Sequence, residues 1–334
     1  MLFYYLLATV LASAAGFFGL FPNFEFLNSF GVLETASAAL IVYSCVGFNQ
    51  PTGKRIALSF SSSFIIATAC GILVCYLAQG VQALTTPNTW ISLSKILHPY
   101  LVALPVTLCL KNKKDPITIA IVAISVSAVF ILATTCLEIF AAYDHFSFKA
   151  FEFYISDMNN EYLKIYEEYN MGILAQKVYV SFLTRMSVSL LPGTCIMLAV
   201  IQIFIVIAAL KALLKEKLLE YNKGPWAVSL STISAIINII SIIAFMSCFF
   251  STSIDTFSAV AGNVMLILAP ASSIIGFAFL MLGFRKGGLM NIFFGVLPIL
   301  MLFVAPQLAI IYISFIGSSN IIFTRIASAM LKIK

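Results

Sequence analysis

Long apolar blocks, each separated from the next by a short polar stretch, make up most of this chain. Many blocks hold 20 or more uncharged positions, and about 20 helical residues suffice to cross roughly 30 Å of hydrocarbon. Cutting the chain at charges and at Pro, Gly and Asn clusters predicts helices at 2–21, 30–48, 56–83, 93–110, 117–143, 185–210, 227–250, 257–283 and 289–316. We therefore expect an all-α fold: a polytopic membrane helix bundle of eight or nine transmembrane helices, forming one integral membrane domain over residues 1–334.

Three of the predicted helices have features that leave their course open. The fourth is short because Lys95, His98 and Pro99 crowd its start, so we expect it to be tilted or partly interfacial. The last contains Pro298 and Pro306 and either spans once or forms a broken or re-entrant hairpin. The first lacks the basic residues that open a secretory signal, so we expect it to be retained as a span.

One sizeable polar stretch interrupts the apolar pattern, between the fifth and sixth predicted helices. It covers residues 144–184 and interleaves acidic residues such as Glu152 and Asp157 with aromatic ones such as Phe153 and Tyr154. This composition is typical of an amphipathic helix at a membrane surface. We predict an acidic extramembrane helical insert that lies on the membrane face or against the bundle.

Composition excludes a soluble domain. Apolar residues make up 61% of the chain and charged residues only 10%, whereas a soluble protein holds about 25% charged residues. The net charge is +6, but the basic residues lie in short clusters between apolar blocks. We therefore expect the lipid bilayer as the surrounding partner and no nucleic-acid partner.

The basic clusters predict an orientation. Short loops on one side carry eleven basic residues: Lys54, Arg55, Lys111, Lys113, Lys114, Lys211, Lys215, Lys217, Lys223, Arg285 and Lys286. The short loops at 22–29, 79–90 and 251–256 on the other side carry none. Because positive loops stay in the cytoplasm, we predict a multi-pass protein of a bacterial inner membrane with its N-terminus in the cytoplasm.

No recognised catalytic motif occurs in the chain. A nucleophile elbow, a P-loop, an HExxH helix and a GxGxxG turn are all missing, and the two histidines lie far apart in the sequence. The seven cysteines fall inside apolar runs, without a CxxC pair. We expect a protein that is not an enzyme and has no catalytic residue, metal site or cofactor.

Ionisable groups in or near the predicted helices are the remaining candidates for function, because they are costly in hydrocarbon. Glu34, Glu138 and His98 are accordingly candidate ligand-binding residues. The predicted topology places both carboxylates toward the outer face, where they would suit a cation or an amine-bearing ligand. The alternative is that each carboxyl reaches the interface or pairs with a base such as Lys95 or Arg185.

Small residues gather in the third and eighth predicted helices. Examples in the eighth are Gly262, Ala269, Ser272 and Gly276. Small side chains let helix backbones approach closely, and serine hydroxyls can bond across the contact. Such faces favour helix packing, with a ligand groove as the alternative.

Several local features occur together in the chain: Leu104-Pro105 before a basic turn and a long span, Leu191-Pro192 after the acidic insert, Gly224-Pro225-Trp226 and, more loosely, Pro298 and the segment 317–325. Through these features the sequence resembles, over residues 95–325, the YybS-like family of uncharacterised bacterial membrane proteins. That family typically has an Asp where Asn320 stands here, which puts any role of that acid in doubt. Its membrane core is similar to the substrate-binding subunits of energy-coupling-factor transporters.

Two functions follow as expectations. The resemblance implies a subunit that binds or transports a small solute, with a small-molecule ligand in the outer half of the bundle. The other is a structural or assembly scaffold for cell-envelope machinery, held by a membrane or cytoplasmic protein partner. A pocket lined by Glu34 or Glu138 would favour the first, and a fully packed bundle would favour the second.

The loop charges generate a topological prediction. Single-cysteine probes at Asn112 and Lys286 should be shielded from membrane-impermeant thiol reagents in intact cells, whereas a probe at Asn160 should be labelled, because the eleven basic residues keep their loops in the cytoplasm. Labelling at Asn112 without labelling at Asn160 would invert the orientation.

Overall fold

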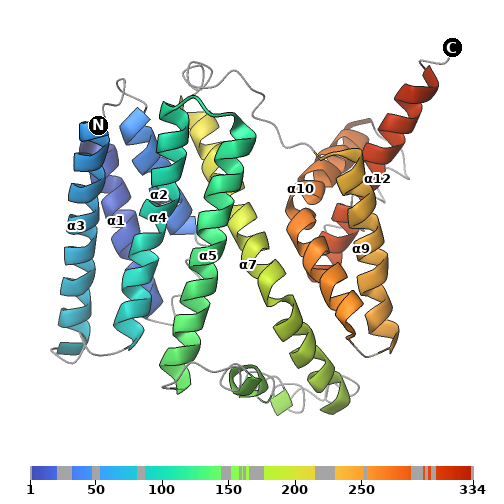
Figure 1. The fold of residues 1–334 in the computed structure, drawn as a ribbon, viewed down its shortest axis with the longest axis horizontal. Coiled ribbons are helices and arrows are strands. Elements are labelled where there is room, and N and C mark those ends of the chain that lie inside the picture. Colours follow the sequence, from blue (N-terminus) through green and yellow to red (C-terminus); the bar gives the residue numbers. More distant parts are fainter. Residues whose placement is uncertain are drawn as a thin grey trace. The chain divides into compact units, whose positions relative to one another are not determined.

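A computed structural model describes residues 2–20, 32–46, 53–80, 87–143, 152–157, 160, 163–164, 177–214, 230–251, 254–286, 296–297, 300–301 and 306–331. Its main helices, in chain order, are α1 (Leu2–Leu20), α2 (Val32–Val46), α3 (Gly53–Gln79), α4 (Pro87–Lys111), α5 (Pro116–Tyr143), α7 (Lys177–Leu214), α9 (Thr232–Ser251), α10 (Thr256–Lys286) and α12 (Pro306–Leu331) (Figure 1). The described residues contain helices and no strand, which confirms the all-α class.

Five segments of the described part are long and apolar enough to cross a membrane. They are Thr89–Lys111, Pro116–Ile139, Arg185–Leu214, Thr256–Leu282 and Leu308–Met330. Shorter apolar helices cover Leu33–Val46, Phe60–Leu73 and Thr232–Cys248. The chain is thus built as a polytopic helical membrane protein, while the count of eight or nine spans stays a prediction.

The fourth predicted helix is longer than the sequence pattern indicated. α4 has 25 residues and begins at Pro87, so Lys95, His98 and Pro99 lie inside it rather than at its start. Proline suits the first position of a helix, where its missing N–H has no intrahelical partner in any case. The expectation of a short helix with a polar start was therefore wrong.

The last helix also differs from its prediction, because α12 runs from Pro306 to Leu331 instead of ending near residue 316. Gly317 and its polar neighbours resemble a helix end in the sequence, but they form a packing surface. A Cβ atom on Gly317 would overlap the backbone carbonyl of Ser272 in α10. Most of 287–305, including Pro298, lies outside the described residues. One span and a hairpin therefore both stay predictions for this segment.

Residues 177–184, the last part of the predicted insert, are helical. They begin α7, a helix of 38 residues, and the apolar span within α7 starts at Arg185. The insert as an extramembrane element stays a prediction. Within the rest of the insert, residues 152–157 form a helix in which Glu152 and Phe153 are exposed. The remainder lies almost entirely outside the described residues.

The chain divides into two compact units. Unit 1 comprises residues 1–154 and 198–226, and unit 2 comprises residues 155–197 and 227–334. α7 contributes its first part to unit 2 and its last part to unit 1. The prediction of one membrane domain over the whole chain stays a prediction.

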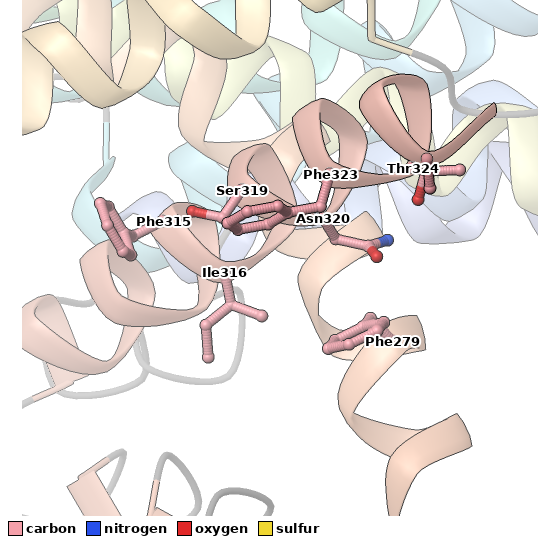
Figure 2. Close-up of a pocket in the computed structure, with 8 residues that line it drawn as sticks. Phe279, Phe315, Ile316, Ser319, Asn320, Phe323 and Thr324 are labelled. Atoms are coloured by element: carbon pink, nitrogen blue, oxygen red, sulfur yellow. The ribbon is translucent and has the colours of Figure 1, made fainter. Parts of the chain in front are cut away.

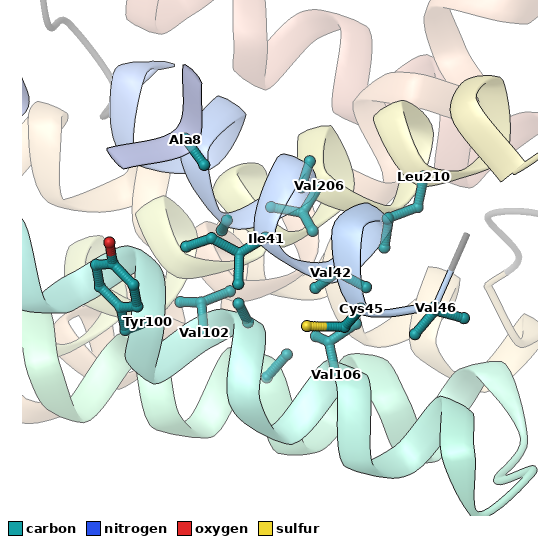
Figure 3. Close-up of a cluster of buried hydrophobic side chains, with 14 of the residues drawn as sticks. Ala8, Ile41, Val42, Cys45, Val46, Tyr100, Val102, Val106, Val206 and Leu210 are labelled. Carbon is teal, nitrogen blue, oxygen red and sulfur yellow. The ribbon is translucent and has the colours of Figure 1, made fainter. Parts of the chain in front are cut away.

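Unit 1 is held by an apolar core that α1, α2, α4 and α7 share. Figure 3 shows Ala8 of α1, Ile41 of α2, Val106 of α4 and Val206 of α7 directed into the same cluster, and all four are fully buried. The outward surface of α5 is apolar too, with Val129 69% exposed. An apolar exterior around an apolar core is the composition that a lipid environment requires.

Unit 2 packs α9, α10 and α12 through small residues. A Cβ atom on Gly276 would overlap the Ile313 carbonyl, so α10 and α12 meet backbone to backbone. Gly262 likewise leaves room for Leu190 and Phe245. The small residues of α10 thus support close helix packing, as the sequence pattern favoured.

Polar residues cap several helices at their N-termini. The Asp115 carboxylate accepts a hydrogen bond from the Thr118 amide at 3.0 Å, and Asp255 accepts one from the Ser258 amide at 2.8 Å. Hydrogen bonds from the Thr118 and Ser258 side chains are the largest cause that holds the pKa of each aspartate below its ordinary value, and the bonds from the two amides are the next. Both residues lie in loops, where they end the preceding connection and start α5 and α10.

Asn263 of α10 bridges two backbone groups of α7. The Gly193 amide donates to Asn263 Oδ1 at 2.6 Å, while Asn263 Nδ2 donates to the Ser189 carbonyl at 2.7 Å. Ser189 and Gly193 are four residues apart, the spacing of a helical backbone hydrogen bond, and Pro192 lies between them. The lack of a side chain on Gly193 lets Asn263 approach.

This bridge generates a stability prediction. Asn263→Ala should lower the free energy of unfolding by about 1–3 kcal/mol for each backbone group left without a partner. Thermal unfolding of the purified protein in detergent measures it. Asn320→Ala is the matched control, since that amide lies in an open groove on α12. Equal stability of both variants would show that the bridge contributes nothing.

Candidate functional site

Two chains of buried polar side chains cross unit 1. The shorter one joins three helices: the Thr9 and Ser63 hydroxyls are 2.9 Å apart, and the Ser63 hydroxyl is 2.8 Å from the Tyr100 hydroxyl. Phe60 and Phe64 pack edge-on against the Tyr100 ring. All members are neutral, and we assign this chain to helix packing.

The longer chain joins four helices and contains the ionisable groups. His98 Nδ1 of α4 lies 3.8 Å from Glu34 Oε2 of α2, and His98 Nε2 lies 3.0 Å from the Ser127 hydroxyl of α5. The Ser127 hydroxyl donates to Gln202 Oε1 of α7 at 3.0 Å. The side chains of His98 and Glu34 are only 5% and 9% exposed, so the ionisable pair is shielded from the surroundings.

Packing around the imidazole fixes its orientation. The ring of Phe130 stacks on His98 with centroids 4.8 Å apart and an interplanar angle of 4°. Phe130 lies three positions after Ser127, so the two share one face of α5. That face of α5 therefore contacts the His98 imidazole twice: the Ser127 hydroxyl meets the ring edge, and the Phe130 ring stacks on the ring plane.

The geometry suits ionic rather than covalent chemistry. A separation of 3.8 Å is an ion-pair contact and is longer than a hydrogen bond. A carboxyl beside an imidazole can exchange a proton or hold a cation, and the neutral hydroxyl and amide can orient either one. Within the described residues, no group of three His, Cys, Asp or Glu side chains is placed to hold a metal ion.

Glu138 does not belong to this series of linked polar side chains. It is half-buried on α5, eleven positions after Ser127, which corresponds to about 16 Å along the helix at 1.5 Å per residue. Of the three residues singled out in the sequence, the structure therefore brings Glu34 and His98 together and leaves Glu138 apart. Whether any of them binds a ligand stays a prediction.

Comparison with known proteins places the chain in a family. Residues 54–319 match the sequence model of a family described as "Predicted membrane protein (DUF2232)", and this match covers most of the chain. The chain belongs to the DUF2232 family. No curated protein and no solved structure matches it.

The family match bears on the longer polar chain. His98, Ser127 and Gln202 of this DUF2232 protein lie inside the matched segment, whereas Glu34 precedes it. The ionisable pair therefore joins a residue of the family segment to a helix outside it. The likeness to YybS-like proteins and to energy-coupling-factor subunits stays an expectation.

Sequence reasoning missed Ser127 and Gln202. Ser127 resembles any other serine in an apolar helix. Gln202 carried a readable signal, because it is a single amide between Ile201 and Ile203 in a long uncharged run. Its partner Ser127 is 75 positions away in the sequence, so only the fold connects the two.

A groove on unit 2 contains Asn320, the position at which the resemblance to YybS-like proteins leads one to expect an acid. It has a volume of about 610 Å³ and is lined by Phe279, Phe315, Ile316, Ser319, Asn320, Phe323, Thr324 and Ala327. Figure 2 shows the lining residues of α12 together with Phe279 of α10. The groove is mostly apolar, with three polar side chains along α12.

The bridging position of Ser127 generates a prediction with a control on the same helix. Ser127→Ala should lower the free energy of unfolding by about 1–3 kcal/mol, because His98 Nε2 and Gln202 Oε1 both lose their partner. Ser125→Ala removes an exposed hydroxyl two residues earlier and should change stability little. Thermal unfolding of both variants decides, and equal midpoints would contradict the bridge.

Proposed function

We propose that this DUF2232 protein binds or transports a small solute in the membrane. Its binding centre is the chain of four polar side chains formed by Glu34, His98, Ser127 and Gln202. The observation that carries the proposal is the buried contact between Glu34 and His98 inside a lipid-facing bundle. Ionisable groups at membrane depth are costly, and they commonly mark substrate or ion pathways.

The four side chains indicate the class of solute. The Glu34 carboxylate attracts a cation or an amine-bearing group, while the Ser127 hydroxyl and the Gln202 amide offer neutral hydrogen-bonding groups. The proposal assigns no catalytic residue and treats the protein as a carrier or binding subunit rather than an enzyme. Energy-coupling-factor binding subunits remain the analogy suggested by the resemblance.

The proposed orientation places the N-terminus in the cytoplasm, in line with the basic loops. α2 then begins at the outer face, with Glu34 in its first turn. A solute from outside would meet this end of the bundle first. Glu34 is therefore the proposed entry residue, with His98 behind it.

A second candidate is a scaffold for cell-envelope machinery, and the groove on α12 is the observation that favours it. Ser319, Asn320 and Thr324 line this groove within a segment that is apolar enough to span the membrane. Polar side chains on a membrane helix are commonly covered by another helix. Loss of a co-purified membrane partner on Asn320→Leu, with the Glu34 variants unaffected, would favour the scaffold.

Complementation of a deletion strain tests the binding centre. Glu34→Gln and His98→Gln should yield inserted, expressed protein that fails to complement, because each removes an ionisable group of the proposed binding centre. Glu152→Gln removes an exposed carboxylate in the insert and should complement normally. Full complementation by both Glu34→Gln and His98→Gln would exclude the proposed centre.

Glu138 is tested in the same assay, as the other candidate carboxylate. If it contributes to solute binding, Glu138→Gln should leave a stable, correctly inserted protein that fails to complement. If its carboxyl only reaches the interface, the amide has nearly the same volume and should preserve activity. Normal complementation by both Glu138→Gln and Glu138→Ala would remove it from the proposed site.

A further inference from the structure

The C-terminal end of α12 is longer than its membrane span requires. α12 has 26 residues and is therefore about 39 Å long at 1.5 Å per residue, whereas the hydrocarbon core of a bilayer is about 30 Å thick. Every side chain from Phe323 to Met330 is exposed, although these residues are still helical. The single charged residue of α12, Arg325, lies in this exposed part. Because a charge is costly in hydrocarbon, this end of α12 belongs at the headgroup region.

The charge at this end is positive. The sequence adds Lys332 and Lys334 to Arg325, and no acidic residue follows Pro306. An arginine guanidinium presents its N–H donors in a planar fork that matches a phosphate group. Basic side chains next to a membrane span attract anionic lipid headgroups. The end of α12 is therefore complementary in charge to an anionic phospholipid.

The groove on unit 2 leads from this end into the membrane-spanning part. Its lining on α12 runs from Phe315 to Ala327, and it borders Arg325 through Thr324. Phe315 lies ten positions before Arg325, which is about 15 Å along the helix. Half of a hydrocarbon core of about 30 Å has the same length. The groove therefore extends from Arg325 through the depth of one leaflet.

The chemistry of the lining follows the order of groups in a phospholipid. The polar side chains, at positions 319, 320 and 324, lie within six positions of Arg325 and can donate to the ester oxygens of a glycerol backbone, which only accept. The deepest lining residues on α12, Phe315 and Ile316, are apolar, as is Phe279 of α10. Figure 2 shows Ile316 and Asn320 directed to the side on which Phe279 lies. Headgroup, glycerol and acyl chain would thus each meet a matching part.

The volume of the groove suits an acyl chain better than a helix. A helix about 10 Å across occupies on the order of 1,200 Å³ over 15 Å of its length. The groove, at about 610 Å³, has half of that volume. An acyl chain is a single row of methylene groups and lies within such a groove. The groove therefore favours a lipid over the partner helix that a scaffold would place there, and the two occupants exclude each other.

We propose that the groove between α10 and α12 binds one anionic phospholipid, with its phosphate at Arg325 and one acyl chain along Phe315, Ile316 and Phe279. The site lies within unit 2 and does not depend on the binding centre proposed in unit 1. A lipid that merely surrounds an apolar helix has no preference for a headgroup. This site requires a preference for a negative one.

Fluorescence quenching by brominated lipids tests the site in the full-length protein. Phenylalanine replaces the two native tryptophans, Trp90 and Trp226, and Phe279→Trp places a single reporter in the groove. The protein is reconstituted at low ionic strength in phosphatidylcholine vesicles that contain a graded fraction of brominated phosphatidylglycerol or of brominated phosphatidylcholine. Ile243→Trp, at a position of α9 that is 62% exposed, is the control reporter.

We expect phosphatidylglycerol to bind about fivefold more strongly than phosphatidylcholine at the groove reporter, since a basic side chain near an anionic lipid surface contributes about 1 kcal/mol. The control reporter on α9 should show no preference. Arg325→Gln should abolish the preference in the groove, because the guanidinium that holds the phosphate is lost. Lys113→Gln removes the same charge from an exposed turn between α4 and α5 and should leave the preference unchanged.

Three results would overturn the proposal. Equal quenching by both lipids at Phe279→Trp would show an unselective lipid contact. Absence of quenching by either lipid there, with normal quenching at Ile243→Trp, would show that a protein helix covers the groove. A preference that survives Arg325→Gln would place the anion elsewhere. If Phe279→Trp fails to fold, Phe323→Trp is the reporter, because that ring lines the groove and is 69% exposed.

Discussion

The structure depends on one constraint: a polar group inside a bundle surrounded by lipid has no water to bond to and must find its partner in the protein. Apolar contacts do not select partners among helices here, because lipid chains are as apolar as leucine. Polar side chains do select partners, because each has only a few hydrogen-bonding groups within reach. In unit 1, Ser63 joins α3 to α1 and α4, and Ser127 joins α5 to α4 and α7.

Asn238 in unit 2 shows what the same constraint costs when it is not fully met. Its Nδ2 lies within 3.2 Å of the Ser272, Ser314 and Ser318 hydroxyls, yet its Oδ1 is buried without a hydrogen-bond partner. Such a group costs about 1–3 kcal/mol. The close approach of α10 and α12 at Gly276 and Gly317 sets this geometry, so backbone packing prevails over full pairing of one amide.

Hydropathy predicted where the helices lie because crossing a membrane is a property of a continuous segment, which a single sequence displays. It failed at positions whose meaning depends on a neighbouring helix. Gly317 and Asn320 resembled a helix end, yet both lie in the middle of α12, and Gly317 packs against α10. For the same reason, the search for charges found Glu34 and His98 but missed Gln202 and Asn263, whose single amides in apolar helices form the polar links.

The pairing of Glu34 with His98 has the same cause as the neutral links, since both satisfy polar groups that lack water, but it differs from them in one respect. A serine or an amide satisfies its partner in a single protonation state, so the links at Tyr100 and Asn263 can only hold helices together. A carboxyl and an imidazole can each donate or accept, depending on which of them holds a proton. The contact between Glu34 and His98 therefore differs from the neutral links in kind, since its two groups are ionisable, and ionisable groups at membrane depth commonly mark substrate or ion pathways.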